Sequence, residues 1–197
     1  VTSNGTWSVT NTGVNGSLAS VYYVSTVEEG VGAGNCSNGC GFTSSNTTDR
    51  TLHISSSQSW VGDQGAAYEI GGGCPFICGF DTDKRAESPT INLSGQSNIT
   101  LTLEYLHLGD QNVASSPNTD FAQLMYFDGV TWTNLLGPMG TPMPITLPAG
   151  CAPQSRWASL TMPMPASANN NANVRLGILW TNNDDGIGED PSIAIDN

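Results

Sequence analysis

The residues with the clearest chemical potential lie between Trp180 and the end of the sequence. An apolar alternation ends at Trp180, and a Gly-rich loop follows with four acidic residues in seven positions: Asp184, Asp185, Glu189 and Asp190. A second alternation then places Ile193 and Ile195 on one face and Asp196 on the other. Crowded carboxylates oppose folding unless a cation lies among them, and calcium takes six to eight oxygen ligands. The sequence therefore predicts a calcium site in this stretch, with Asp184, Asp185 and Asp190 as the ligands from the loop.

A solvated hairpin loop is the alternative interpretation of this stretch, because Asn, Asp and Gly are also the residues that turns require. The loop is not an EF-hand. Aligning Gly186 with the glycine of that motif puts Thr181 at its first ligand position and Ser192 at the place of its bidentate Glu.

The five cysteines form two Cys-x3-Cys pairs and one single residue: Cys36, Cys40, Cys74, Cys78 and Cys151. A four-ligand metal site is one interpretation, although structural zinc sites more often use a two-residue spacing. The Gly- and Asn-rich surroundings favour disulfides in an oxidising compartment. We expect Cys36–Cys40 and Cys74–Cys78 bridges, with cross-pairing left open because sequence alone does not fix connectivity. Cys151 is then a free thiol or pairs outside this sequence.

Catalytic signatures are scarce. The only two histidines, His53 and His107, lie in strand-like segments, and neither adjoins a candidate nucleophile in sequence. Spacing alone leaves open a Ser-His-Asp set assembled in three dimensions. The G-x-S-x-G and H-E-x-x-H motifs are absent. We therefore expect a protein that is not an enzyme.

Composition restricts the partners. Of the 197 residues only 11% are charged, five are Lys or Arg, and the net charge is -12. Nucleic-acid binding draws on clustered basic residues, so nucleic acid is not an expected partner. No apolar run approaches the roughly 20 residues of a membrane span. We expect a mature, secreted fragment.

Apolar residues alternate with a period of two through most of the chain, and a helical period is nearly absent. Many short strands with Gly, Pro and Asn turns predict an all-β antiparallel sandwich or jelly roll. The expected strands are Thr6–Thr10, Ser20–Ser25, Arg50–Ser55, Gly65–Ile70, Ser88–Leu93, Asn98–Leu108, Phe121–Phe127, Thr131–Leu135, Arg156–Met162, Asn173–Trp180 and Ser192–Asp196.

Two features shape the expected domain organisation. Four prolines between Gly137 and Gly150 preclude a central strand there, so this segment is an edge or a surface excursion. No linker interrupts the strands, so residues 1–197 are expected to form one domain. Because the sequence stops inside an expected strand, we also expect it to be part of a longer multidomain chain.

Several segments resemble the MAM-like jelly-roll modules of bacterial surface and secreted proteins that are exported by the type IX, gliding-associated route. The similar segments include Thr51-Leu-His-Ile, Arg85-Ala-Glu-Ser-Pro, the Trp180-x-Asn-Asn-Asp-Asp-Gly-x-Gly-x-Asp-Pro-Ser motif and Ala194-Ile-Asp-Asn. The resemblance implies a concanavalin-like jelly roll in a modular protein at the bacterial cell surface. It also implies a structural calcium between an early acidic residue and the last strand, and by position the ligands are Glu28, Asp49 and Asp196. This site competes with the loop site, or shares one ion with it.

Three functions follow as expectations. The first is a non-catalytic, calcium-stabilised adhesion module that contacts other domains of its own chain or a protein or glycan at the cell surface. The second is a carbohydrate-binding module of a secreted enzyme, with Trp60 and Trp132 as sugar platforms if they are exposed. The third is a structural spacer or filament domain.

Overall fold

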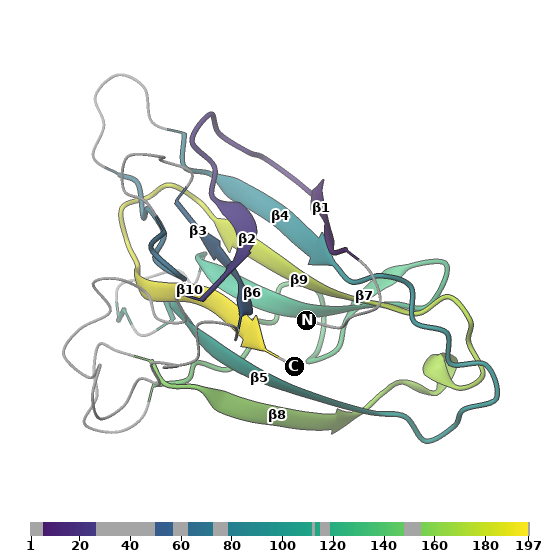
Figure 1. Ribbon diagram of the computed structural model, residues 1–197. Coiled ribbons are helices and arrows are strands. Elements are labelled where there is room, and N and C mark those ends of the chain that lie inside the picture. The colour runs from purple at the N-terminus through teal and green to yellow at the C-terminus, as the bar shows by residue number, and fades with distance from the viewer. Residues whose placement is uncertain are drawn as a thin grey trace.

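The computed structural model describes residues 6–26, 50–56, 63–72, 79–111, 113–114, 119–147 and 155–196. They form two five-stranded antiparallel sheets that pack face to face (Figure 1). The prediction of an all-β sandwich is confirmed. The described residues contain one 3-10 turn, Ala166–Ala168, and no helix long and apolar enough to cross a membrane.

We name each sheet after its middle strand. The β9 sheet has the order β1-β4-β9-β6-β7, with bounds Ser8–Asn11, Thr82–Glu87, Arg175–Asn182, Phe121–Phe127 and Trp132–Asn134. The β10 sheet has the order β2-β3-β10-β5-β8, with bounds Val21–Ser25, Thr51–Ser55, Glu189–Asp196, Thr100–Gly109 and Ala158–Pro163.

The core lies between the sheets and comes from the alternating apolar residues. Successive strand side chains point to opposite faces, so one of every two residues faces the partner sheet. The buried core cluster joins residues from both sheets: Ile54, Tyr68, Leu103, Tyr105, Ala122, Leu124, Met143, Ile178, Trp180, Ile193 and Ile195. Trp180 is fully buried and meets Tyr68 edge-on, with ring centroids 4.9 Å apart. Trp180 is therefore part of the core.

Two predicted strands are wrong. Residues Gly65–Ile70 form no strand, because Gly65 has a φ of 61° and the segment instead caps β10, where the amide of Ser192 donates to the carbonyl of Ala66. Residues Ser88–Leu93 contain Pro89, which has no N–H to donate. In place of a continuous ladder, the amide of Ser88 bonds the carbonyl of Leu176 in β9, and Ile91 forms an isolated bridge with Val174 just before β9.

Strand β4 was missed because its sequence, Thr-Asp-Lys-Arg-Ala-Glu, carries charge where an interior strand is expected to be apolar. It nevertheless lies between β1 and β9. The ammonium group of Lys84 is satisfied by the carbonyl of Ser20 at 2.6 Å. Its neighbour on the opposite face, Arg85, is held by Glu87 at 2.7 Å. Specific polar partners replace the hydrophobic pattern in this strand.

The acidic loop does not close a hairpin. Strand β9 belongs to one sheet and β10 to the other, so the loop after Asn182 crosses the end of the sandwich (Figure 1). The hairpin interpretation of this loop is therefore wrong, although the strands on both sides of it were predicted.

The proline-rich segment after Gly137 forms no strand through residue 147, as expected. It is nonetheless partly internal. Met143 is fully buried and donates its amide to the carbonyl of Ala122 in β6, whereas the amide of Thr146 bonds the carbonyl of His107 in β5. The segment therefore links the two sheets at the same end as the acidic loop.

Candidate functional site

The carboxylates of the acidic loop accept hydrogen bonds from the loop and its neighbour. Asp184 Oδ1 accepts from the amide of Gly72 at 3.3 Å. Asp185 accepts from the amide of Ile187 at 2.8 Å and from the side chain of Asn183 at 3.0 Å. These are the bonds that turn-forming Asp residues make. The two residues thus shape the crossing between the sheets.

Two further aspartates at this end are strongly desolvated. Asp120 is fully buried and accepts from the amide of Asn183 at 3.1 Å and from the hydroxyl of Tyr68 at 3.1 Å. Asp190 accepts from the amide of Tyr68 at 2.9 Å. Burial raises the pKa of each carboxyl to about 7, and the charge of Asp110 adds to the effect at Asp120. Sequence reasoning missed Asp120, because nothing nearby in sequence reveals that it faces the loop.

The predicted loop ligands are not gathered into one group in the part of the chain that the structure describes. The described residues contain no group of three or more His, Cys, Asp or Glu side chains that could hold a metal ion. Asp184 and Asp185 are engaged within the loop, and Asp190 is bound to a backbone amide. Glu28 and Asp49 lie outside the described residues.

Asp196, a predicted ligand of the second site, lies far from the three predicted loop ligands. It is at the opposite end of β10 from Asp190, pairing with Glu104, whereas Glu189 pairs with Gly109. Six residues of extended strand span roughly 20 Å. The idea that one ion is shared by both predicted sites is therefore wrong. The chain leaves β2 at Ser25 and enters β3 at Thr51, which pair with each other at the Asp196 end.

The predicted disulfides lie outside the described residues. Cys36, Cys40, Cys74, Cys78 and Cys151 all belong to these segments, so their pairing remains a prediction.

Both histidines are buried and neutral. His107 Nε2 accepts from the amide of Ala122 at 3.3 Å, so its Nδ1–H donates to the carbonyl of Ser192. His53 bonds the hydroxyls of Ser25 at 3.2 Å and Thr51 at 3.1 Å. Burial lowers the pKa of each histidine to about 4. A general base works best with a pKa near the operating pH, so these contacts fix the rings without making strong bases.

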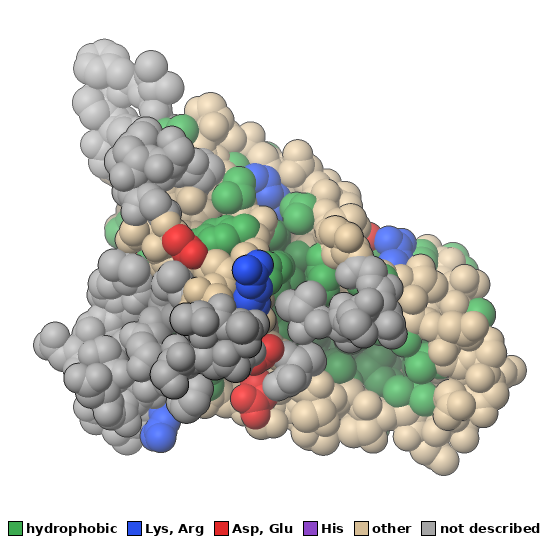
Figure 2. All heavy atoms as spheres, viewed as in Figure 1, with side chains coloured by type: hydrophobic (Ala, Val, Ile, Leu, Met, Phe, Trp, Pro, Cys, Tyr) green, Lys and Arg blue, Asp and Glu red, His purple; other side chains and the backbone are tan. Residues whose placement is uncertain are grey.

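A cavity of about 500 Å³ opens between the sheets at the Asp196 end of the sandwich. Figure 2 shows green hydrophobic side chains exposed in this hollow. The lining is mostly aliphatic and comes from both sheets and from the segment after β4: Trp7, Leu52, Ser88, Pro89, Thr90, Ile91, Asn92, Leu101, Leu103, Leu124, Leu176, Ile178, Ile195 and Asp196. Its volume and its mostly apolar lining are those of small-molecule pockets.

Among the described residues, the cavity lies where β5 extends beyond its pairing with β10. Strand β10 pairs with β5 from Gly109 to Glu104 and reaches no further among the described residues. Strand β5 continues to Thr100, paired only with β8 on its other side. The inward side chains of Leu101 and Leu103 therefore face the β9 sheet with no neighbouring described strand beside them.

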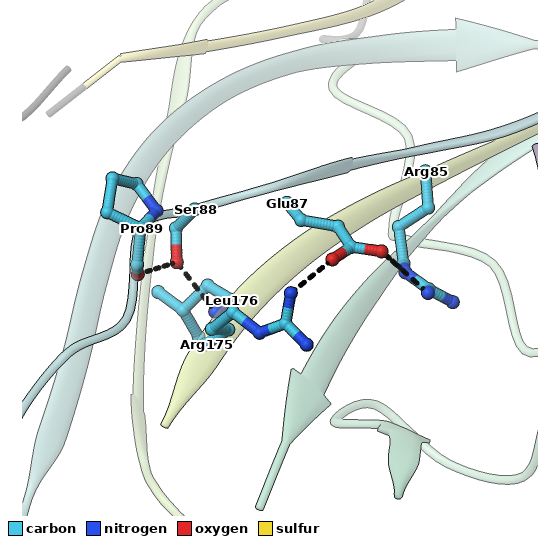
Figure 3. A network of polar contacts seen from close by, with 6 residues as sticks. All are labelled: Arg85, Glu87, Ser88, Pro89, Arg175 and Leu176. Atoms are coloured by element: carbon cyan, nitrogen blue, oxygen red, sulfur yellow. Dashed lines mark hydrogen bonds and ion pairs between the residues drawn. The ribbon is translucent and has the colours of Figure 1, made fainter. Parts of the chain in front are cut away.

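The upper lip of the cavity is fixed by hydrogen bonds to β9. The hydroxyl of Ser88 donates to the carbonyl of Pro89 at 2.9 Å and accepts from the amide of Leu176 at 2.9 Å (Figure 3). The amide of Ile91 then bonds the carbonyl of Val174 at 2.7 Å. These bonds fix the segment after β4 against β9 and the residue before it.

Beside this lip, the outer face of the β9 sheet carries an ion-pair cluster. Glu87 accepts from Arg85 at 2.7 Å and from Arg175 at 2.6 Å (Figure 3). The guanidinium of Arg85 also lies over the Trp132 ring, 4.0 Å from its centroid. Gly177 makes room, since a Cβ there would lie 2.8 Å from that ring. One half-buried tryptophan is therefore already covered by a cation.

Comparisons with protein-family models, with curated proteins and with solved structures find no match for this chain.

Proposed function

We propose that this chain is a non-catalytic binding module, an extracellular adhesion or interaction domain whose ligand enters the cavity between the sheets. The observation that carries the proposal is the open, mostly aliphatic cavity of about 500 Å³. Unfilled apolar space in a core costs stability, because the atoms around it lose their packing contacts. A cavity that is open to the surface and fixed at its lip is well suited to binding an apolar group.

A neutral, environment-sensitive dye tests the proposal. N-phenyl-1-naphthylamine fluoresces more strongly in apolar surroundings, and we expect saturable binding of one dye per chain. Leu101→Trp projects a larger ring into the cavity from β5 and should reduce binding about tenfold or more, since it removes the contact area that drives association.

Thr102→Trp is the matched control. Thr102 is exposed on the opposite face of the same strand, where its hydroxyl lies 3.2 Å from that of Thr161. The control should bind the dye as the unmodified protein does, with both variants checked by thermal melting. Equal binding by the unmodified protein and folded Leu101→Trp, or no saturable binding at all, would contradict the proposal.

The resemblance to MAM-like jelly-roll modules adds the setting to this proposal: a modular protein at the bacterial cell surface, exported by the type IX route and stabilised by calcium. The order of strands supports a sandwich, and the jelly-roll connectivity is part of what we propose. The calcium ion would use Glu28, Asp49 and Asp196, since Ser25 and Thr51, the last residue of β2 and the first of β3, lie at the Asp196 end of the β10 sheet.

Carbohydrate binding is the second candidate, with the half-buried Trp132 on the outer face of the β9 sheet as its platform once the Arg85 guanidinium that lies over its ring moves aside. Trp180 is not available as a sugar platform because it is fully buried. Trp60 lies outside the described residues. A glycan array with unmodified protein and Trp132→Ala separates the candidates: glycan binding that Trp132→Ala abolishes and Leu101→Trp preserves would favour the carbohydrate module.

A further inference from the structure

The outer face of the β9 sheet gathers two of the five Lys and Arg residues of the chain, Arg85 and Arg175. The guanidinium of Arg85 lies 4.0 Å from the ring centroid of Trp132. That of Arg175 lies 4.5 Å from the ring centroid of Phe127. Glu87 bonds both guanidiniums (Figure 3), and we call these five residues the arginine cluster. Two cations and one carboxylate leave it with an excess of positive charge, in a chain whose net charge is -12.

Each guanidinium keeps hydrogen-bond donors that the described residues do not use. A guanidinium has five N–H groups. Arg175 gives only Nη1 to Glu87, and Arg85 gives Nε and Nη2. The other acidic residue of β4, Asp83, bonds the hydroxyl of Thr181 instead. Stacking on a ring uses the face of a guanidinium and leaves its in-plane N–H groups available. The side chain of Arg175 is 29% exposed, so a ligand in solution can reach it.

A neutral sugar and an acidic sugar meet this cluster differently. A neutral sugar packs against the face of an aromatic ring, and the guanidinium of Arg85 already lies over the Trp132 ring. A sugar with a carboxylate can instead bond the free edge of a guanidinium, because the two groups match in geometry. Phe127 and Trp132 are half-buried, with ring centroids 5.2 Å apart, so their exposed carbon atoms can contact the sugar ring.

We propose that the arginine cluster binds a uronic acid unit of a polysaccharide. The carboxylate bonds Arg175, and the sugar ring lies against the exposed carbon atoms of Phe127 and Trp132. This inference rests on the carbohydrate-binding candidate, for which it names the ligand class, and it is independent of the cavity. A net charge of -12 repels a dense polyanion, so the polysaccharide carries its acidic units sparsely.

An acidic peptide is the competing ligand, and this part of the sheet offers it less. Glu87 and Arg175 belong to β4 and β9, which are interior strands of the β9 sheet. An interior strand has no free edge that could bond a peptide backbone. A peptide would therefore bind through its side chains alone, without the backbone bonds that give peptide ligands much of their affinity.

Two oligosaccharides test the requirement for charge. The first is a short xylo-oligosaccharide with one glucuronic acid branch. The second is the methyl ester of the same compound, which removes the charge and keeps the sugar rings. We expect the acid to bind the unmodified protein about tenfold more tightly than the ester at low salt, because the charge-assisted bonds to Arg175 are lost in the ester. Isothermal titration calorimetry measures both dissociation constants, and added salt should reduce the difference.

Arg175→Gln and Arg156→Gln separate the cluster from general electrostatic attraction. Both variants remove one positive charge, but Arg156 is exposed just before β8, in the other sheet. We expect Arg175→Gln to bind the acid as weakly as the ester, and Arg156→Gln to bind it as the unmodified protein does. Thermal melting checks the folding of each variant. If Arg175→Gln does not fold, Arg175→Lys keeps the charge beside Glu87 and should bind the acid about threefold more weakly, because it lacks the planar fork.

Equal affinities for acid and ester, equal losses in the Arg175 and Arg156 variants, or no binding of either compound would overturn the proposal. Tighter binding of a blocked Gly-Glu-Gly peptide than of the acidic sugar would overturn the choice of a sugar. Binding of N-phenyl-1-naphthylamine is measured in the same samples. Dye binding without sugar binding overturns this inference and leaves the cavity function intact, whereas sugar binding without dye binding overturns the cavity function alone.

Discussion

Asp120 is a buried ionisable residue whose hydrogen-bond donors, the amide of Asn183 and the hydroxyl of Tyr68, are neutral. Asp120 is fully buried and its pKa is raised to about 7 by burial, with the nearby charges of Asp110 and Asp185 adding to the shift. The native state therefore holds a proton between pH 4 and 7 that the unfolded chain has released. Stability is lost as pH rises through this range, since the native state binds more protons there.

Replacing Asp120 with Asn should remove this penalty. The amide can still accept from the backbone of Asn183 and donate to the oxygen of Tyr68. We expect Asp120→Asn to raise the free energy of unfolding by about 2–4 kcal/mol at pH 8 and to have little effect at pH 4. Chemical denaturation at pH 4, 6 and 8 measures the difference between the two proteins.

Asp128→Asn is a control, because the pH dependence of stability that Asp128 contributes has the opposite sign. The amides of Val130 and Thr131 donate to Asp128 in the β6–β7 turn and lower its pKa. Its contribution to stability is present above the unfolded pKa and lost as pH falls, so this variant should be destabilised at pH 8. A stability difference for Asp120→Asn that does not change with pH would contradict the role given to Asp120.

At the scale of elements, strand β4 shows how a polar sequence becomes an interior strand. Glu87 lies between Arg85 of its own strand and Arg175 of β9, with side-chain exposures of 6%, 13% and 29% for Glu87, Arg85 and Arg175. Two arginines thus share one carboxylate, and Arg85 is additionally packed over Trp132. Removing the carboxylate would leave two mostly buried cations next to each other.

We expect Glu87→Ala to lower the free energy of unfolding by about 2–4 kcal/mol, because breaking a buried ion pair leaves an uncompensated charge. The free energy of unfolding of Glu87→Gln should lie between those of the unmodified protein and Glu87→Ala, since the amide oxygen can still accept from one arginine. Glu104→Ala is the matched control: Glu104 is exposed on β5, and its loss should change stability by less than about 0.5 kcal/mol. Thermal and urea unfolding measure all three, and equal effects of Glu87→Ala and Glu104→Ala would contradict the network.

The sequence predicted strands best where alternation is regular. Strand Phe121–Phe127 was predicted with its observed bounds, and its alternate residues Ala122, Leu124 and Tyr126 lie in the buried clusters. Strand β4 could not be predicted this way, since its stability comes from partners that are distant in sequence, such as Ser20 and Arg175. The alternation in Ser88–Leu93 was misleading because Pro89 interrupts the ladder.

The candidate site was less predictable than the fold. Sequence identified the acidic loop but could not show that β9 and β10 lie in different sheets, which turns the loop into a crossing. No pattern of neighbouring residues in the sequence indicates the cavity. Its lining comes from strands of both sheets that pair with different partners, and strand register is a property of paired segments.

At the scale of the whole molecule, the two acidic regions lie at opposite ends of β10 and can be tested apart. A net charge of -12 on 197 residues opposes compaction through self-repulsion. A cation that binds only the folded state would relieve part of this repulsion, and a hundredfold excess over Kd stabilises by about 2.7 kcal/mol.

We expect EDTA to lower the melting temperature by several degrees and millimolar calcium to restore it. Asp196→Ala should reduce the calcium response if the ion lies at the cavity end, whereas Asp184→Ala should leave it unchanged. The reverse result would place the ion at the acidic loop. Superimposable melting curves in EDTA and in calcium would show that no calcium contributes to stability.

The arrangement of the sheets has a consequence for how the chain is made. Residues 175–196 supply the middle strand of both sheets, β9 and β10. Thr82 pairs with Asn182, and Leu52 pairs with Ile195, so neither pairing can form until the last two strands have been made. During synthesis, most of the described strands are therefore made before either sheet can close. Such distant pairing slows folding and leaves apolar strands exposed meanwhile.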